Sequence, residues 1–309
     1  MQLEGIHHIS SITGDAPRNV DFYVRVLGMR MVKRTVNQDD PSVYHLFYAD
    51  EQGRPGADMT FFEYPGARRG RAGAGMVHRV VIRVDSEASL DFWATRLEAE
   101  GAATERDGTS LRFADPEGLG LELIVDTSDD TPLTANAPDI PAEHALRGFA
   151  GVRAYTRDPA ASAQLLRATL GFNPVGDAGA SYEVRGLRSG FYAYDPAPEE
   201  RGRPGAGTVH HVAWSAQDED IESWNAQVGN AGAHTSGLVD RYWFRSVYFR
   251  EPSGVLFEIA TLGPGFTRDE PLEHLGETLV LPPHLERLRS QIEGIVTPLP
   301  NPRAAGTPR

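Results

Sequence analysis

Two histidine doublets and one glutamate are the residues whose types and spacing could support metal chemistry. His7 and His8 lie in a predicted strand over 6–12, His210 and His211 lie in another over 209–215, and Glu258 follows near the end of the repeat. Two imidazoles and one carboxylate bind one face of Fe(II) and leave positions open for substrate and dioxygen. Because side chains alternate across a strand, only one histidine of each doublet can face a common site.

Composition narrows the setting in which such a site works. The 309 residues include no cysteine, so a metal site must use the 10 histidines and the carboxylates. A net charge of −13 makes nucleic acid and anionic membranes poor partners. No apolar run reaches the roughly 18 residues of a membrane span, and the first residues lack the features of a signal peptide. We therefore expect a cytoplasmic protein with no nucleic acid or membrane partner, and the sequence leaves a homo-oligomer open.

Three internal matches show that the chain is duplicated. Residues 69–79 (RGRAGAGMVHR) align without a gap with 201–211 (RGRPGAGTVHH), so His78 matches His210 and Arg79 matches His211. Segments 3–28 and 146–171 share residues at a constant offset of 143. A third match pairs Glu122 with Glu258. Three matches in the same order indicate a duplicated half that itself contains two modules.

Each of the four modules has the same predicted element order. Each module begins with a short predicted strand that contains apolar residues. A helix such as 20–27 follows, and two or three closing strands complete the module. The predicted opening strands cover 6–12, 77–83, 149–155 and 209–215. We expect an α+β fold of four βαβββ modules in two cup-shaped half-barrels. The predicted domains are 1–138 (modules over about 1–66 and 67–130, then a Pro-rich linker), 139–266, and a tail over 267–309 with one amphipathic helix.

Counting ligands predicts how the modules pair. If the second histidine of each doublet is the ligand, which the resemblance of this sequence to a known family implies, the ligand position of the four opening strands holds His8, Arg79, Gly151 and His211. Pairing the modules in chain order never puts two histidines and a carboxylate in one cup. Pairing module one with four and two with three brings His8, His211 and Glu258 together. The other cup then has Arg79 in the ligand position, and an ion pair with Glu122 is expected there instead of a metal.

The sequence resembles the vicinal oxygen chelate superfamily, and within it the ring-cleaving dioxygenases that open hydroquinones. The resemblance covers almost the whole chain and rests on the motifs GIHHIS (5–10), VKRTV (32–36), YHLFYADEQGRPG (44–56), VHHVA (209–213), GVLFE (254–258) and GFTRDE (265–270). It implies extradiol-type cleavage of a small aromatic substrate with O₂, in aromatic hydrocarbon catabolism. The implied cofactor is Fe(II), with Mn(II) as the alternative ion.

The resemblance also assigns individual residues. It selects His8, His211 and Glu258 as the metal ligands, a choice between neighbours that strand alternation alone leaves open. It implies further roles around the metal or the substrate for five more residues, which are His7, Ser10, His210, Arg241 and Tyr248. At Ser10 the family pattern has a threonine, and the hydroxyl group is retained.

Two other functions remain open at this stage. A glyoxalase-like isomerase or lyase of the same superfamily would use a metal as a Lewis acid. Such a site usually has a fourth protein ligand, for which Glu63 is the nearby candidate. A metal-free protein that binds small molecules would need no ligand triad at all. The metal content of the purified protein separates these alternatives.

Overall fold

The structure, a computed structural model, describes residues 1–176 and 179–303 of the chain. Over these residues the chain forms four consecutive modules, each with an opening strand, a helical segment and three more strands. The first module contains β1 (Ile6–Thr13), α1 (Ala16–Val20), the π-helical segment η1 (Asp21–Val26), β2 (Arg30–Val36), β3 (Tyr44–Ala49) and β4 (Asp58–Glu63). The second contains β5 (Met76–Val84), α2 (Glu87–Ala99), β6 (Glu105–Asp107), β7 (Ser110–Ala114) and β8 (Gly120–Val125).

The second half of the chain repeats this order. The third module contains β9 (Phe149–Thr156), η3 (Pro159–Ser162), η4 (Leu165–Thr169), β10 (Asn173–Pro174), β11 (Ser181–Arg185) and β12 (Ser189–Pro196). The fourth contains β13 (Thr208–Ala216), α3 (Ile221–Asn230), β14 (Val239–Asp240), β15 (Arg245–Arg250) and β16 (Leu256–Thr261). Short helical turns and α4 (Arg289–Ile295) follow β16. The predicted α+β class and the βαβββ order are confirmed.

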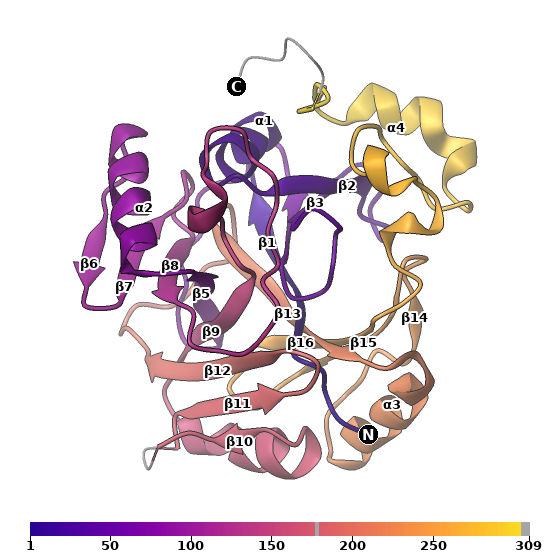
Figure 1. Ribbon diagram of the computed structural model, residues 1–309. Coiled ribbons are helices and arrows are strands. Elements are labelled where there is room, and N and C mark those ends of the chain that lie inside the picture. Colours follow the sequence, from indigo (N-terminus) through magenta and orange to yellow (C-terminus); the bar gives the residue numbers. More distant parts are fainter. Residues whose placement is uncertain (177–178, 304–309) are drawn as a thin grey trace.

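The strands assemble into two sheets that do not follow chain order. Within the described part of the chain, one eight-stranded sheet has the order β14-β15-β16-β13-β1-β4-β3-β2, and the other has β10-β11-β12-β9-β5-β8-β7-β6. The first and fourth modules therefore share one sheet, and the second and third share the other, as the indigo-to-yellow colouring of Figure 1 shows. The module pairing predicted from ligand counting is confirmed.

The helices cover the outer faces of the sheets with apolar side chains at helical spacing. In α2, which begins after the capping residue Ser86, the buried side chains include Leu90, Trp93 and Leu97. In α3 they include Trp224, which is 1% exposed. Both tryptophans therefore lie in the core.

The predicted helix over 20–27 differs in form. It begins earlier, as α1, and continues as the π-helical turn η1, in which Leu27 N donates to the Phe22 carbonyl oxygen over 2.9 Å. The chain then leaves the helix at Gly28, where φ is 70°, the left-handed conformation that glycine commonly adopts at a helix C-terminus. A wider turn still buries Phe22, Tyr23 and Val26 on one side, so the apolar pattern identified the buried face but not the helix type.

The segment after β16 folds back onto the first module. Lys33 of β2 is 0% exposed, and its ammonium contacts the carboxylates of Asp269 and Glu270. Residues 304–309 of the predicted tail lie outside the described residues. No helix in the described ranges has the length and apolar character needed to cross a membrane.

Candidate metal centre

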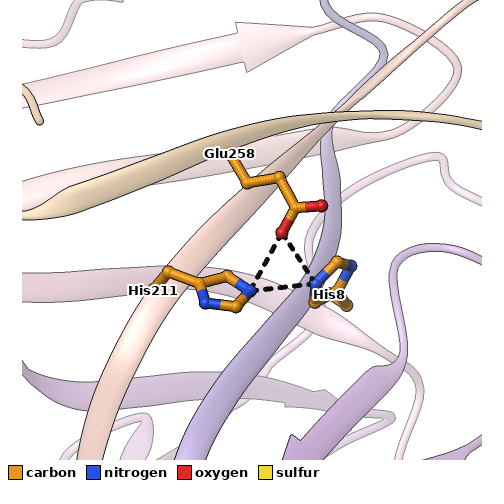
Figure 2. Close-up of side chains that lie close together, drawn as sticks. All are labelled: His8, His211 and Glu258. Atoms are coloured by element: carbon orange, nitrogen blue, oxygen red, sulfur yellow. Dashed lines mark hydrogen bonds and ion pairs between the residues drawn. The ribbon is translucent and has the colours of Figure 1, made fainter. Parts of the chain in front are cut away.

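Three buried side chains converge inside the cup formed by the first and fourth modules. His8 on β1, His211 on β13 and Glu258 on β16 are 1%, 3% and 0% exposed. The Nε2 atoms of the two histidines lie 3.2 Å apart, and they lie 3.2 Å (His8) and 2.9 Å (His211) from Oε2 of Glu258. Figure 2 shows the three ligand atoms pointing toward one another. The structure thus brings together the three residues predicted as metal ligands.

Strand order explains this convergence. The strands β16, β13 and β1 are neighbours in the sheet, so residues more than 200 positions apart in sequence become adjacent. In the ladder, Ser10 is opposite His211, while Ala213 is opposite both His8 and Glu258. Their side chains therefore lie on the same face of the sheet, toward the inside of the cup.

The chemistry of these donors fits a divalent metal ion. Oε2 of Glu258 is buried without a hydrogen-bond partner, although both Nε2 atoms lie at ion-pair distance from it. Burial alone would raise the pKa of Glu258, but the facing imidazoles hold that pKa well below its ordinary value. A buried carboxylate oxygen with no hydrogen bond, next to two imidazole nitrogens, is the arrangement that a coordinated cation satisfies.

Two β-bulges decide where the other histidine of each doublet goes. Along the β1–β13 ladder, β1 has one extra residue between Ile6 and His8, which is His7, and β13 has one extra residue, which is His210. Simple alternation would point these side chains away from the ligands. At the bulges they turn instead toward their neighbours, because a bulge changes the direction of the side chain. The Nδ1 atoms lie 2.9 Å apart in the His7–His8 pair and 2.8 Å apart in the His210–His211 pair.

The contacts of His7 determine which nitrogen of His8 is free for a metal. Nε2 of His7 lies 3.1 Å from the carbonyl oxygen of Thr261, which can only accept, so this nitrogen carries the proton. Burial, together with the neighbouring His8, lowers the pKa of His7 to about 3, so the ring is neutral near pH 7. Its Nδ1 then accepts from Nδ1–H of His8. The Nε2 lone pair of His8 is left facing Glu258 and His211.

A cavity of about 230 Å³ opens beside the three candidate ligands. Of the further residues predicted around the site, His210, Arg241 and Tyr248 line this cavity. His7 is behind His8, and Ser10 is 0% exposed and hydrogen-bonded to Thr60 over 2.7 Å, so neither of them lines the cavity. The remaining walls are largely aromatic and include Phe47, Phe62, Trp243 and Phe244.

Sequence reasoning missed part of this cavity. His45 was not among the predicted site residues, but it lines the cavity, and its Nε2 lies 3.0 Å from the Thr60 hydroxyl. Asp39, which also lines the cavity, was not singled out. A sequence signal for His45 was available, because it lies two residues before Phe47 in β3 and so shares one face of the strand with that residue. No comparable local signal exists for Asp39, which lies in the loop between β2 and β3.

The fourth ligand that a glyoxalase-like site would need is not assembled. Glu63 is buried, and its Oε1 accepts from Ala16 N and from the Thr297 hydroxyl, each over 2.9 Å. The residue of β4 that corresponds to Glu258 is Thr60. Thr60 is opposite Ser10, which lies two residues after His8, and Glu258 is opposite Ala213, which lies two residues after His211. Among the described residues, the group of potential ligands within 4.8 Å of one another contains only the three named above.

The second cup retains the carboxylate but has lost the histidines. Nη1 of Arg79 lies 3.7 Å from Oε2 of Glu122, as the predicted ion pair requires, and Nε of Arg153 lies 3.3 Å from the same oxygen. Gly151 occupies the position equivalent to His8, and a Cβ there would come within 2.5 Å of the Phe191 ring. Arginines and an aromatic ring thus fill the space that corresponds to the His8, His211 and Glu258 cluster of the first cup.

Comparisons with known proteins agree with this architecture. The family model for the Glyoxalase/Bleomycin resistance protein/Dioxygenase superfamily matches residues 5–123 and 148–259. MhqO of Bacillus subtilis (strain 168), named as a ring-cleaving dioxygenase, is 41% identical over 94% of each chain. A chlorohydroquinone/hydroquinone 1,2-dioxygenase of Sphingobium indicum is 33% identical over 94% of this chain and 95% of that protein.

Solved structures give the same result. The crystal structure of a Bacillus subtilis protein named as a dioxygenase superposes with a TM-score of 0.89 at 39% identity, over 96% of this chain and 97% of the other. These matches confirm the resemblance predicted from the sequence motifs. By its sequence, its four modules and its crossed sheets, the chain belongs to the Glyoxalase/Bleomycin resistance protein/Dioxygenase superfamily.

Proposed function

We propose that the protein is a non-haem Fe(II)-dependent dioxygenase that cleaves the ring of a hydroquinone or a related dihydroxy-aromatic compound with O₂. The observation that carries this proposal is a set of two histidines and one glutamate, with no fourth protein ligand among the residues that the structure describes, beside an aromatic-lined cavity. When bound, Fe(II) would provide coordination positions for a phenolate oxygen and for O₂ and would pass electrons from the coordinated ring to O₂. The names of the relatives agree with this reaction class.

The cavity walls suit a flat aromatic ring. Phe47, Phe62 and Phe244 offer apolar surface, and Phe244 also packs on the rings of His7 and His8 at centroid distances of 5.1 and 5.4 Å. We infer that these rings orient the substrate and keep water away from the reacting carbon. The volume of about 230 Å³ accommodates a single substituted benzene ring.

Two polar groups on the cavity wall are placed to handle protons. Burial, reinforced by Glu258, raises the pKa of Tyr248, so its hydroxyl stays protonated near neutral pH. Its oxygen accepts from Nε of Arg241 over 3.2 Å, which leaves the hydroxyl proton available for a substrate oxygen. His210 has Nδ1 engaged with His211, and we infer that its Nε2 exchanges protons with substrate or product.

Oxygen uptake tests this proposal directly. Protein prepared without metal is loaded anaerobically with Fe(II) or with Mn(II), and O₂ consumption is followed on hydroquinone, chlorohydroquinone and catechol. We expect uptake with Fe(II) and at least one hydroquinone, with formation of a ring-opened acid. Stoichiometric metal binding without uptake on any of these compounds would overturn the proposed reaction, and greater uptake with Mn(II) would overturn the choice of metal.

A further inference from the structure

The arginine in the cavity wall is already paired with a carboxylate from another module. Nη1 and Nη2 of Arg241 donate to Oδ1 and Oδ2 of Asp39 over 3.1 and 2.9 Å, and Nε donates to Tyr248. Both terminal nitrogens therefore face the same carboxylate, in the two-pronged geometry that gives arginine–carboxylate pairs their strength and direction. Arg241 follows β14 in the fourth module, whereas Asp39 lies between β2 and β3 in the first.

The backbone on both sides holds this pair in place. Asp39 N donates to Oδ1 of Asn37 over 3.0 Å, and Nε2 of Gln38 donates to the Arg241 carbonyl oxygen over 2.8 Å. Arg241 N donates to the Phe244 carbonyl oxygen over 2.9 Å. The Asp39 side chain is 71% exposed and that of Arg241 is 19% exposed, so the pair closes the outer rim of the cavity.

The charges in the cavity give this pair a consequence for substrate choice. Within the described part of the chain, Arg241 is the one lysine or arginine that lines the cavity. The other polar lining groups are the Asp39 carboxylate itself, four histidines, two tyrosines, the indole of Trp243 and the amides of Asn37 and Gln38. A carboxylate on the side of the ring that lies away from the metal would need a cationic partner in the cavity wall, but the Arg241 guanidinium already has Asp39 as its counter-ion. Burying the carboxylate without such a partner is unfavourable.

We propose that Asp39 is a specificity-determining residue: by holding Arg241, it restricts the cavity to dihydroxybenzenes that carry no carboxylate group. This inference rests on the proposed function, since it assumes that the cavity accepts a dihydroxy-aromatic ring. Asp39→Asn removes the charge and one of the two acceptor oxygens while keeping the size of the side chain. The guanidinium then has one unpaired nitrogen and an uncompensated charge facing the cavity.

Anaerobic binding measures this effect without turnover. Metal-loaded protein is titrated under argon with catechol and with 3,4-dihydroxybenzoate, which is the same ring with a carboxylate that is adjacent to neither hydroxyl and so cannot chelate the metal together with one of them. The two dissociation constants are obtained by calorimetry, and we expect the unaltered protein to bind catechol more tightly. In Asp39→Asn, the ratio of the dissociation constant of 3,4-dihydroxybenzoate to that of catechol should fall on the order of tenfold, the value of one charge-assisted hydrogen bond.

Two variants control this experiment. Asp39→Glu retains a carboxylate at this position, so the ratio of the two dissociation constants should equal that of the unaltered protein. Asp40→Asn makes the same substitution at the next residue, an exposed aspartate that bonds to Ser42 and does not line the cavity, and should leave the ratio unchanged. A ratio that does not change in Asp39→Asn, including a parallel weakening of both ligands, would overturn the inference alone. Failure of the unaltered protein to bind either ring would overturn the proposed function together with the inference.

Discussion

Replacing His7 tests whether the first histidine of the doublet sets the state of the ligand next to it. In His7→Leu the side chain keeps its apolar volume but loses both hydrogen bonds, the one to the Thr261 carbonyl oxygen and the one from His8. In His7→Gln both can be retained, because the amide oxygen accepts and the amide nitrogen donates. The two variants therefore differ in hydrogen bonding at a position that is 4% exposed.

The magnitude follows from the group that loses its partner. His8 is 1% exposed, so in His7→Leu its Nδ1–H has no water to replace the lost acceptor. A buried donor without a partner costs about 1–3 kcal/mol. His8 avoids this cost by moving its proton to Nε2, which blocks the lone pair that faces Glu258. Either way, metal affinity should fall by roughly 5- to 150-fold, which overlaps the range of about 10- to 100-fold typical of groups that orient metal ligands.

Competition for metal against a chromophoric chelator under argon measures this directly. We expect His7→Gln to bind within a few-fold of the unaltered protein and His7→Leu to bind clearly more weakly, with similar circular dichroism for all. His234→Leu, at an exposed position, is the matched control and should bind metal normally. Equal metal affinity in His7→Leu and the unaltered protein would refute the hydrogen-bond argument and leave His7 with a packing role only.

Further variants test the remaining assignments. Glu258→Gln and His211→Ala should lose bound metal and activity but keep the fold, since a site of three ligands that loses one holds a ferrous ion poorly; near-normal metal content by mass spectrometry in either variant would contradict their role as ligands. His78→Ala should retain full metal content, because this residue belongs to the other cup. Lys33→Met leaves a buried carboxylate unpaired and should lower the free energy of unfolding by about 3–5 kcal/mol in urea titrations. Adding Glu270→Gln should recover part of that loss, and strictly additive effects would argue against their coupling.

The internal repeat, together with the ligand choice implied by the family resemblance, was enough to predict the module pairing. The repeated segments 69–79 and 201–211 identify equivalent opening strands, so each candidate ligand can be assigned to a module. Because His8 belongs to the first module and His211 to the fourth, a site that contains both requires these two modules to pair, as they do in the first sheet. This works because a strand places its side chains by a simple period, and the repeat conveys that register from one module to the next.

The tertiary structure decided how the residues around those ligands interact. The doublets give no sign in the sequence that His7 and His210 sit at β-bulges, because a bulge depends on two strands brought together from about 200 residues apart. The pairing of Asp39 with Arg241 likewise joins two loops from different modules. Sequence determined which residue types were present and which strand face they shared, since both are local properties. Hydrogen-bond partners, bulges and the counter-ion of Arg241 depend on long-range packing, so only the folded chain determines them.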